Sequence, residues 1–181
     1  MKALFRLLRH LWLDADDAHR VINASAMKRL EARVQDSERR HTGEVCLCVE
    51  ASLPVSYLWR HLHGGQPMER VVRERALTLF SKLRVWDTEL NNGVLIYLQL
   101  AERRIEIVAD RGLARHVGDN DWQETLAGVA SEFRANRYED GLARAIDSVT
   151  SALQRYFPAA ASTSEARQQR DNQLPDRPVI R

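Results

Sequence analysis

Apolar side chains recur along this chain with two different spacings, one typical of helices and one typical of strands. The helical spacing of three or four residues covers 26–40, 68–83, 121–134 and 138–157. A short apolar run at 44–50, bounded by turn signals, predicts a buried strand. The nearly continuous apolar run 93–100 is followed by a tight polar link and the alternating stretch 104–109. We therefore expect a β-hairpin over 93–109.

The order of these elements predicts the fold class. A strand that is apolar on both faces belongs in a sheet that is covered on both sides. Helices alternate here with strands before the closing helical pair, so we predict an α/β fold: a three-layer α-β-α sandwich around a small mixed sheet. Residues 51–67 contain Pro54, the Gly64–Gly65 pair and Pro67, and we expect an irregular surface insertion there.

The two ends of the chain have their own patterns. Residues 1–20 are expected to form an amphipathic N-terminal helix, whose apolar stripe contains Leu4, Phe5, Leu8, Leu11 and Trp12. Arginines and a histidine interrupt the stretch, which argues against a signal peptide. Such a helix either packs on its own domain or a second copy, or lies on an anionic membrane surface. The α/β domain is assigned to 21–157, and the polar segment 158–181 is expected to be a disordered or loosely attached tail.

The composition of the chain argues against several classes of function. The chain has 181 residues, 44% of them hydrophobic, so a sizeable core is expected. No apolar run is long enough to span a membrane. With 27 Lys and Arg against 25 Asp and Glu, the net charge is only +2, which argues against a nucleic-acid partner. The two cysteines, Cys46 and Cys48, alternate within a strand and are interpreted as buried side chains.

Chemistry-bearing side chains are expected to gather at one edge of the sheet. In a hairpin, the start of the first strand lies beside the end of the second, so the turn 91–93 should meet the turn 110–112. Glu50 would join this edge if the 44–50 strand ran parallel to the 104–109 strand. The candidate metal ligands are Asp87, Asn91, Asn92, Asp110, Asp119 and Asp121, with Glu89 nearby. Oxygen ligands of this kind suit calcium or magnesium.

Each candidate also has a structural interpretation. Asn91, Asn92 and Gly93 could form only a turn, with Asn and Gly supplying positive φ. Asp119 could be a helix N-cap, Asp121 a first-turn acid, and Asp110 the partner of an arginine. No nucleotide-binding glycine motif, nucleophile elbow or C-x-x-C pair is present, and no organic cofactor is expected. Both interpretations of the acidic residues stay open at this point.

Several motifs together resemble the TPM domain family over Met27 to about Pro158. They are T-G-E-V at 42–45, RALTLFSKLRV at 75–85, N-N-G-V-L-I at 91–96, R-I-E-I-V-A at 104–109, D-R-G-L at 110–113, Trp122, and a closing helix after Phe133, Tyr138 and Gly141. The chain is most similar to a short bacterial branch without signal peptide or membrane anchor. This resemblance implies a Rossmann-like α/β sandwich and an acidic divalent-metal site. Some members of the family are weak acid phosphatases, and others are accessory factors of membrane complexes.

The resemblance also implies roles for individual residues. Asp87, Asn91, Asn92 and Asp110 match positions that line the cleft of the family, and Asp119 and Asp121 correspond to its helix-start acids. Relatives often have a glycine-rich segment where this chain has Asp110-Arg111. Arg111 places a cation in the presumed acidic cleft, where it could instead grip a phosphate.

Two functions follow as hypotheses. The first is an accessory module, cytoplasmic or peripheral to the inner membrane, that docks on a membrane-protein partner or a membrane surface through its N-terminal helix. The alternative is a weak metal-dependent acid phosphatase acting on phosphomonoesters, in which Asp110 and Arg111 would be the catalytic candidates. The absence of an activated nucleophile in the sequence favours the first.

Overall fold

The computed structural model describes residues 2–159 and 173–181, and the side chains within them except those of 2–5, 119, 120 and 124. The helices are α1 (Lys2–Trp12), α2 (Ala15–Val21), α3 (Ala24–Glu38), α4 (Val55–Gly64), α5 (Met68–Lys82), α6 (Arg111–Ala114), the 3-10 helix η1 (Asp119–Trp122), α7 (Gln123–Arg134) and α8 (Tyr138–Tyr156). The strands are β1 (Val45–Glu50), β2 (Val94–Gln99), β3 (Arg104–Ala109) and β4 (Val179–Ile180).

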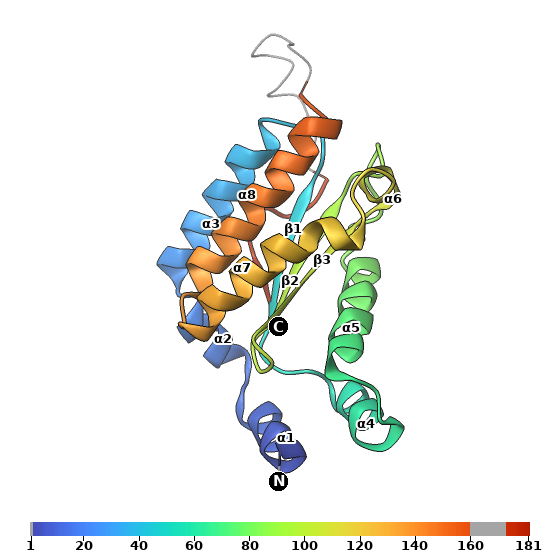
Figure 1. The fold of residues 1–181 in the computed structure, drawn as a ribbon. Coiled ribbons are helices and arrows are strands. Elements are labelled where there is room, and N and C mark those ends of the chain that lie inside the picture. The colour runs from blue at the N-terminus through green and yellow to red at the C-terminus, as the bar shows by residue number, and fades with distance from the viewer. Residues whose placement is uncertain (1, 160–172) are drawn as a thin grey trace.

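The strands form one open mixed sheet in the order β3-β2-β1-β4. Strands β2 and β3 are the predicted antiparallel hairpin, with Val94 opposite Ala109. Strand β1 runs parallel to β2, with Val45 beside Val94, and parallel to β4 on its other side. Helices lie on both faces of this sheet (Figure 1). The predicted three-layer α/β fold with a small mixed sheet is confirmed.

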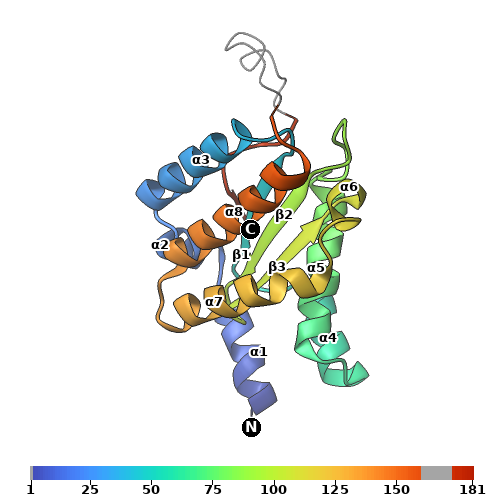
Figure 2. The same ribbon diagram turned by 45° about the horizontal axis from the view of Figure 1, so that its top comes forward.

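Two apolar cores fill the spaces between the layers. On one face, α3, α7 and α8 pack on the sheet, with α2 beside them (Figure 2). On the other face, α4 and α5 cover the sheet. Strand β1 serves both cores by the alternation of its side chains, because Val45, Leu47 and Val49 enter the first core while Cys46 and Cys48 enter the second.

The segment 51–67 was expected to be irregular, and this expectation was wrong. It contains α4, which begins after Pro54 and ends at Gly65, where the backbone is left-handed (φ 62°). Proline before the first helical turn and glycine at the end are ordinary helix start and stop signals. The prolines and glycines of this segment therefore delimit a helix.

The last residues of the expected tail are attached to the sheet. Val179 and Ile180 form β4 beside Cys48 and Val49 of β1. The backbone N–H of Arg181 donates to Val49 O (2.9 Å), and Ala51 N–H donates to Arg181 O (2.8 Å). The polar composition concealed this strand because a two-residue edge strand needs little apolar sequence. The rest of the predicted tail, 160–172, lies outside the described residues.

Glu50 does not join the edge of the sheet predicted for it. Because β1 runs parallel to β2 and not to β3, its final residue lies opposite Gln99, at the far end from the turn at 91–93. Glu50 is buried there, with Oε1 2.5 Å from Nη2 of Arg75, and it accepts the hydroxyl hydrogen of Tyr97 at 2.6 Å. This buried ion pair joins β1 to α5.

Candidate functional site

The turn at 91–93 and the turn at 110–112 meet, as the hairpin predicts; together they are called the rim. Asn91 has a left-handed backbone (φ 52°), and its carbonyl accepts the N–H of Gly112 at 2.7 Å. Its side-chain Oδ1 accepts a hydrogen bond from the guanidinium of Arg111 at 2.9 Å. Gly93 is required by close approach, because a Cβ there would lie 2.0 Å from Val85 O. The conspicuous Asn-Asn-Gly sequence is therefore explained by turn geometry.

Two other rim side chains are buried. Asn92 donates from Nδ2 to the Thr42 hydroxyl at 3.2 Å, and its backbone N–H donates to the Thr88 hydroxyl at 3.1 Å. Asp110 is the N-cap of α6, and its Oδ1 accepts the backbone N–H of Arg111 at 2.7 Å. The second oxygen of Asp110, Oδ2, is buried without a hydrogen-bond partner among the described residues. This oxygen is the one feature of the rim that local structure does not explain.

Asp87 and Asp121, the remaining acidic candidates whose side chains the structure describes, do not complete a ligand set around Asp110. Asp87 lies on the surface and pairs with Arg84. The side chain of Asp119 lies outside the described residues. Asp121 is exposed, and its Oδ2 accepts the N–H of Gly118 at 2.7 Å, so it closes the turn before η1.

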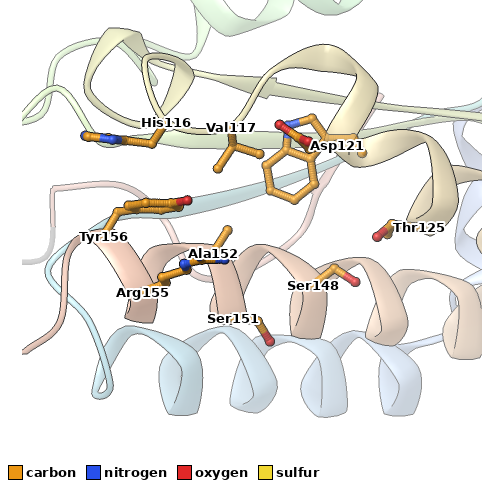
Figure 3. Close-up of a pocket in the computed structure, with 10 residues that line it drawn as sticks. His116, Val117, Asp121, Thr125, Ser148, Ser151, Ala152, Arg155 and Tyr156 are labelled. Atoms are coloured by element: carbon orange, nitrogen blue, oxygen red, sulfur yellow. The ribbon is translucent and has the colours of Figure 1, made fainter.

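Asp121 also lines a pocket of about 480 Å³ between the η1–α7 segment and α8. Figure 3 shows His116 lying flat against Tyr156, and the Arg155 side chain coming from the same helix as Tyr156. The centroids of the His116 and Tyr156 rings are 4.7 Å apart. The guanidinium of Arg155 lies 5.4 Å from the centre of the Tyr156 ring. One carboxylate, one guanidinium and an aromatic wall form a mixed surface, which does not select a cation.

The described residues thus do not fit a divalent cation at the rim. No group of three His, Cys, Asp or Glu side chains among them converges as metal ligands. Asn91 Oδ1 accepts a hydrogen bond from the Arg111 guanidinium. The positive charge beside this oxygen is therefore already supplied by Arg111 and not by a metal cation. Among the buried carboxylate oxygens of the described candidates, only Oδ2 of Asp110 is left without a hydrogen-bond partner for a calcium or magnesium ion.

The cysteines and the paired histidines have structural surroundings. Burial raises the pKa of the Cys46 and Cys48 thiols to about 12, so neither is a thiolate near neutral pH. His61 contacts the guanidinium of Arg6 at 2.9 Å and the carbonyl of Gln66 at 2.7 Å. His63 is stacked on Trp59 with ring centroids 3.5 Å apart. The interpretation of the cysteines as buried side chains is confirmed.

A second region, at the opposite end of the sheet from the rim, is apolar and uncovered. Six of the nine exposed large apolar side chains in the described part of the chain lie on α1 and α4. We call this group the apolar end: Leu8, Leu11 and Trp12 on α1, and Val55, Trp59 and Leu62 on α4. Figures 1 and 2 both place α1 and α4 at the end of the molecule away from α6. Trp12 is 82% exposed and Leu11 63%.

Helix α1 is held to the domain by its opposite face. His10 is buried, and its Nδ1 accepts the backbone N–H of Leu53 at 3.1 Å. Its Nε2 lies 3.1 Å from Oε1 of Glu102, an oxygen that also binds Arg6 at 3.1 Å. Leu7 packs on the core beneath α4 and α5. The predicted stripe of Leu8, Leu11 and Trp12 therefore points away from its own domain; the side chains of Leu4 and Phe5 lie outside the described residues.

The contribution of α4 was missed by the sequence analysis. Val55, Trp59 and Leu62 are spaced by four and three residues, which is the signal of one helical face. The signal was present between Pro54 and the Gly64–Gly65 pair, but those residues were interpreted as loop markers. Among the described helices, none has the length and apolar character needed to cross a membrane.

Comparison with known proteins places this geometry in a family. The sequence matches the TPM domain over residues 15–152. No curated protein is significantly similar to the chain.

Two solved structures share the fold. The BA42 protein from the psychrophilic bacterium Bizionia argentinensis, solved by NMR, is 24% identical with a TM-score of 0.64, covering 87% of this chain and 93% of its own. The N-terminal domain of a P. gingivalis protein, also solved by NMR, is 20% identical with a TM-score of 0.56, covering 76% and 79%. At these identities the likeness concerns the fold. By the match over most of its length, this chain belongs to the TPM domain family.

Proposed function

We propose that this chain is a TPM-domain binding module that docks peripherally at a membrane through its apolar end. The observation that carries the proposal is the exposure of Leu8, Leu11 and Trp12 on α1 together with Val55, Trp59 and Leu62 on α4. Exposed apolar groups gathered in one region of a soluble domain are typical of interaction sites.

The attachment of α1 supports docking by a preformed surface. His10, Arg6 and Glu102 hold the inner face of the helix against the domain. The outer face, with Leu11 and Trp12, is thereby presented without a folding step on binding. Less conformational entropy is lost when a surface is already ordered.

The side chains of the apolar end are more typical of a surface that binds lipid than of one that binds an apolar groove of another protein. Trp is enriched at membrane interfaces, where its ring lies at the level of the headgroups. Trp12 and Trp59 are both largely exposed, and Arg9 lies on the exposed surface of the same helix as Trp12. Amphipathic helices with Trp and Leu on one face and arginines beside them bind at this depth.

Co-sedimentation of the whole chain with lipid vesicles tests the proposal. Replacing Leu11 and Trp12 by Ser should lower the vesicle-bound fraction at least roughly tenfold, because two inserted apolar side chains are removed. The chain offers a matched control at its other end, where Trp86 is 47% and Leu90 52% exposed. The Trp86→Ser, Leu90→Ser variant should bind as the unchanged protein does.

Absence of vesicle binding by the unchanged protein would contradict the proposal and would favour a membrane protein as the partner. The alternative function, a metal-dependent acid phosphatase acting on phosphomonoesters, has less support. The rim supplies one buried, unpartnered carboxylate oxygen, on Asp110, and the guanidinium of Arg111 is hydrogen-bonded to Asn91, another candidate ligand.

A further inference from the structure

A groove of about 640 Å³ opens beside Trp12, where α1 and α2 meet the tip of the β2–β3 hairpin. Its walls are mainly apolar and include Leu13, Val21 and Leu100. Arg9 from α1 and Arg103 from the hairpin line the same groove. Both arginines are exposed, so their charged groups are accessible to a ligand from solvent or from a membrane.

These two arginines differ from their neighbours in charge pairing. Arg6 pairs with Glu102 at 3.1 Å, and Arg20 pairs with Asp17 at 2.5 Å. In the described part of the chain, neither Arg9 nor Arg103 has a carboxylate within 4.0 Å. The groove therefore combines an apolar wall with two uncompensated positive charges.

Arg103 occupies an unusual backbone position for a basic residue. Arg103 has a left-handed backbone (φ 52°) at the hairpin tip, a conformation that few residues other than Gly, Asn and Asp adopt. An ordinary turn residue would meet the backbone requirement with less strain. A basic side chain at this position is therefore not explained by the turn.

We propose that this groove binds the headgroup of an anionic glycerophospholipid. The inference rests on the proposed docking at the membrane and names its preferred lipid. The guanidinium groups of Arg9 and Arg103 would bind the phosphate, for which arginine has matching paired donors. Trp12, Leu13 and Val21 would contact the glycerol and the first part of an acyl chain, as apolar side chains do at this depth.

The test compares vesicles of phosphatidylcholine alone with vesicles that also contain phosphatidylglycerol. The whole chain should partition into the anionic vesicles roughly tenfold to thirtyfold more strongly, from two arginines near the surface. The Arg9→Gln, Arg103→Gln variant should lose this preference and keep its binding to phosphatidylcholine. A variant of equal charge at the rim end of the molecule, Arg115→Gln, Arg155→Gln, should keep the preference.

A third variant separates the groove from a diffuse charge effect. Val21→Trp fills the groove and leaves both arginines, so it should also reduce the preference, with thermal unfolding as the check of its fold. Equal partition of the unchanged protein into both vesicles would overturn the headgroup site and leave the docking intact. Binding to neither vesicle would overturn both proposals. An undiminished preference in the Val21→Trp variant would overturn the groove as the binding site.

Discussion

The two ends of the sheet in this protein use their side chains in opposite ways. At the rim, the polar side chains that resemble metal ligands or catalytic residues form hydrogen bonds within the protein. Asn91 bonds to Arg111, Asn92 bonds to Thr42, and Asp110 caps α6. At the apolar end, six large apolar side chains are between 39% and 82% exposed. Apart from the second carboxylate oxygen of Asp110, turns and a helix cap explain the polar motifs of the rim, while the exposed apolar side chains at the other end indicate where a partner would bind.

The two carboxyl groups near the ends of β1 differ in how their charge is compensated. Glu50, at its final residue, is compensated by Arg75 and by the hydroxyl of Tyr97. Glu38 lies near the first residue, where its Oε1 accepts the N–H of Val45 at 2.8 Å. Burial, together with smaller contributions from the neighbouring carboxyls of Glu44 and Asp176, raises the pKa of Glu38 to about 9. A buried ion pair therefore lies at the final residue of β1, and a partly buried, protonated acid lies near its first residue.

The largest effect is expected from breaking the buried ion pair between Arg75 and Glu50. Arg75→Met leaves the buried carboxylate of Glu50 without its cation and should lower the free energy of unfolding by about 3–5 kcal/mol in urea titrations. Arg70→Met, on the same helix, removes only an exposed pair with Glu74 and should cost less than about 1 kcal/mol. Adding Glu50→Gln to Arg75→Met should recover part of the loss. Equal stability of the Arg75 and Arg70 variants would contradict this account.

A smaller change in stability, of opposite sign, is expected from substituting Glu38 near the first residue of β1. The folded pKa of Glu38 is about 9 against an ordinary value of 4.5, so the folded state holds a proton that the unfolded chain loses. Stability should therefore fall as the pH rises from about 4.5 to about 9.

Glu38→Gln removes this dependence, since its amide can still accept the Val45 N–H. The variant should be more stable at pH 7 by about 3 kcal/mol and equal to the unchanged protein at pH 4. Glu31→Gln, on the same helix, serves as the control. A stability difference that does not change with pH would show that Glu38 is not held in its protonated form.

The smallest expected effect concerns the rim. Asp110→Ala removes the cap of α6 and should cost about 1 kcal/mol of stability. It should leave vesicle binding unchanged, and calcium titrated by calorimetry should give the same heat with and without the substitution. Asp110→Asn keeps an acceptor for the Arg111 N–H and should cost less. Calcium binding that is lost in Asp110→Ala would show that the rim holds a metal site and would contradict the structural role given to Asp110.

The fold was largely predictable because its signals are local. Helical spacing and the hairpin pattern gave α5, α8, β2 and β3 close to their observed bounds. The pairing partner of β1 was not predictable, because strand order depends on contacts far apart in the sequence. The placement of Glu50 failed for that reason, and β4 was missed because two residues carry too little pattern.

The candidate site was predictable in part. The meeting of Asn91 with Arg111 and Gly112 follows from hairpin geometry. The α1 stripe was visible in the sequence, but its exposure was not, because an apolar helical face looks the same whether it packs inward or outward. Trp59 and Arg103 enter the account only through tertiary structure, which brings α4 and the hairpin tip to the end of the molecule that holds α1.

The most direct test of docking through the apolar end is quenching of tryptophan fluorescence by vesicles of brominated phosphatidylcholine. Trp12 and Trp59 lie at the apolar end and are 82% and 59% exposed, whereas Trp86 is 47% exposed beside the rim. We predict that the bromolipid quenches the unchanged protein and the Trp86→Phe variant, and that the Trp12→Phe, Trp59→Phe variant loses most of the quenching. Quenching that is lost in Trp86→Phe and kept in the double variant would place the membrane contact at the rim and contradict the account.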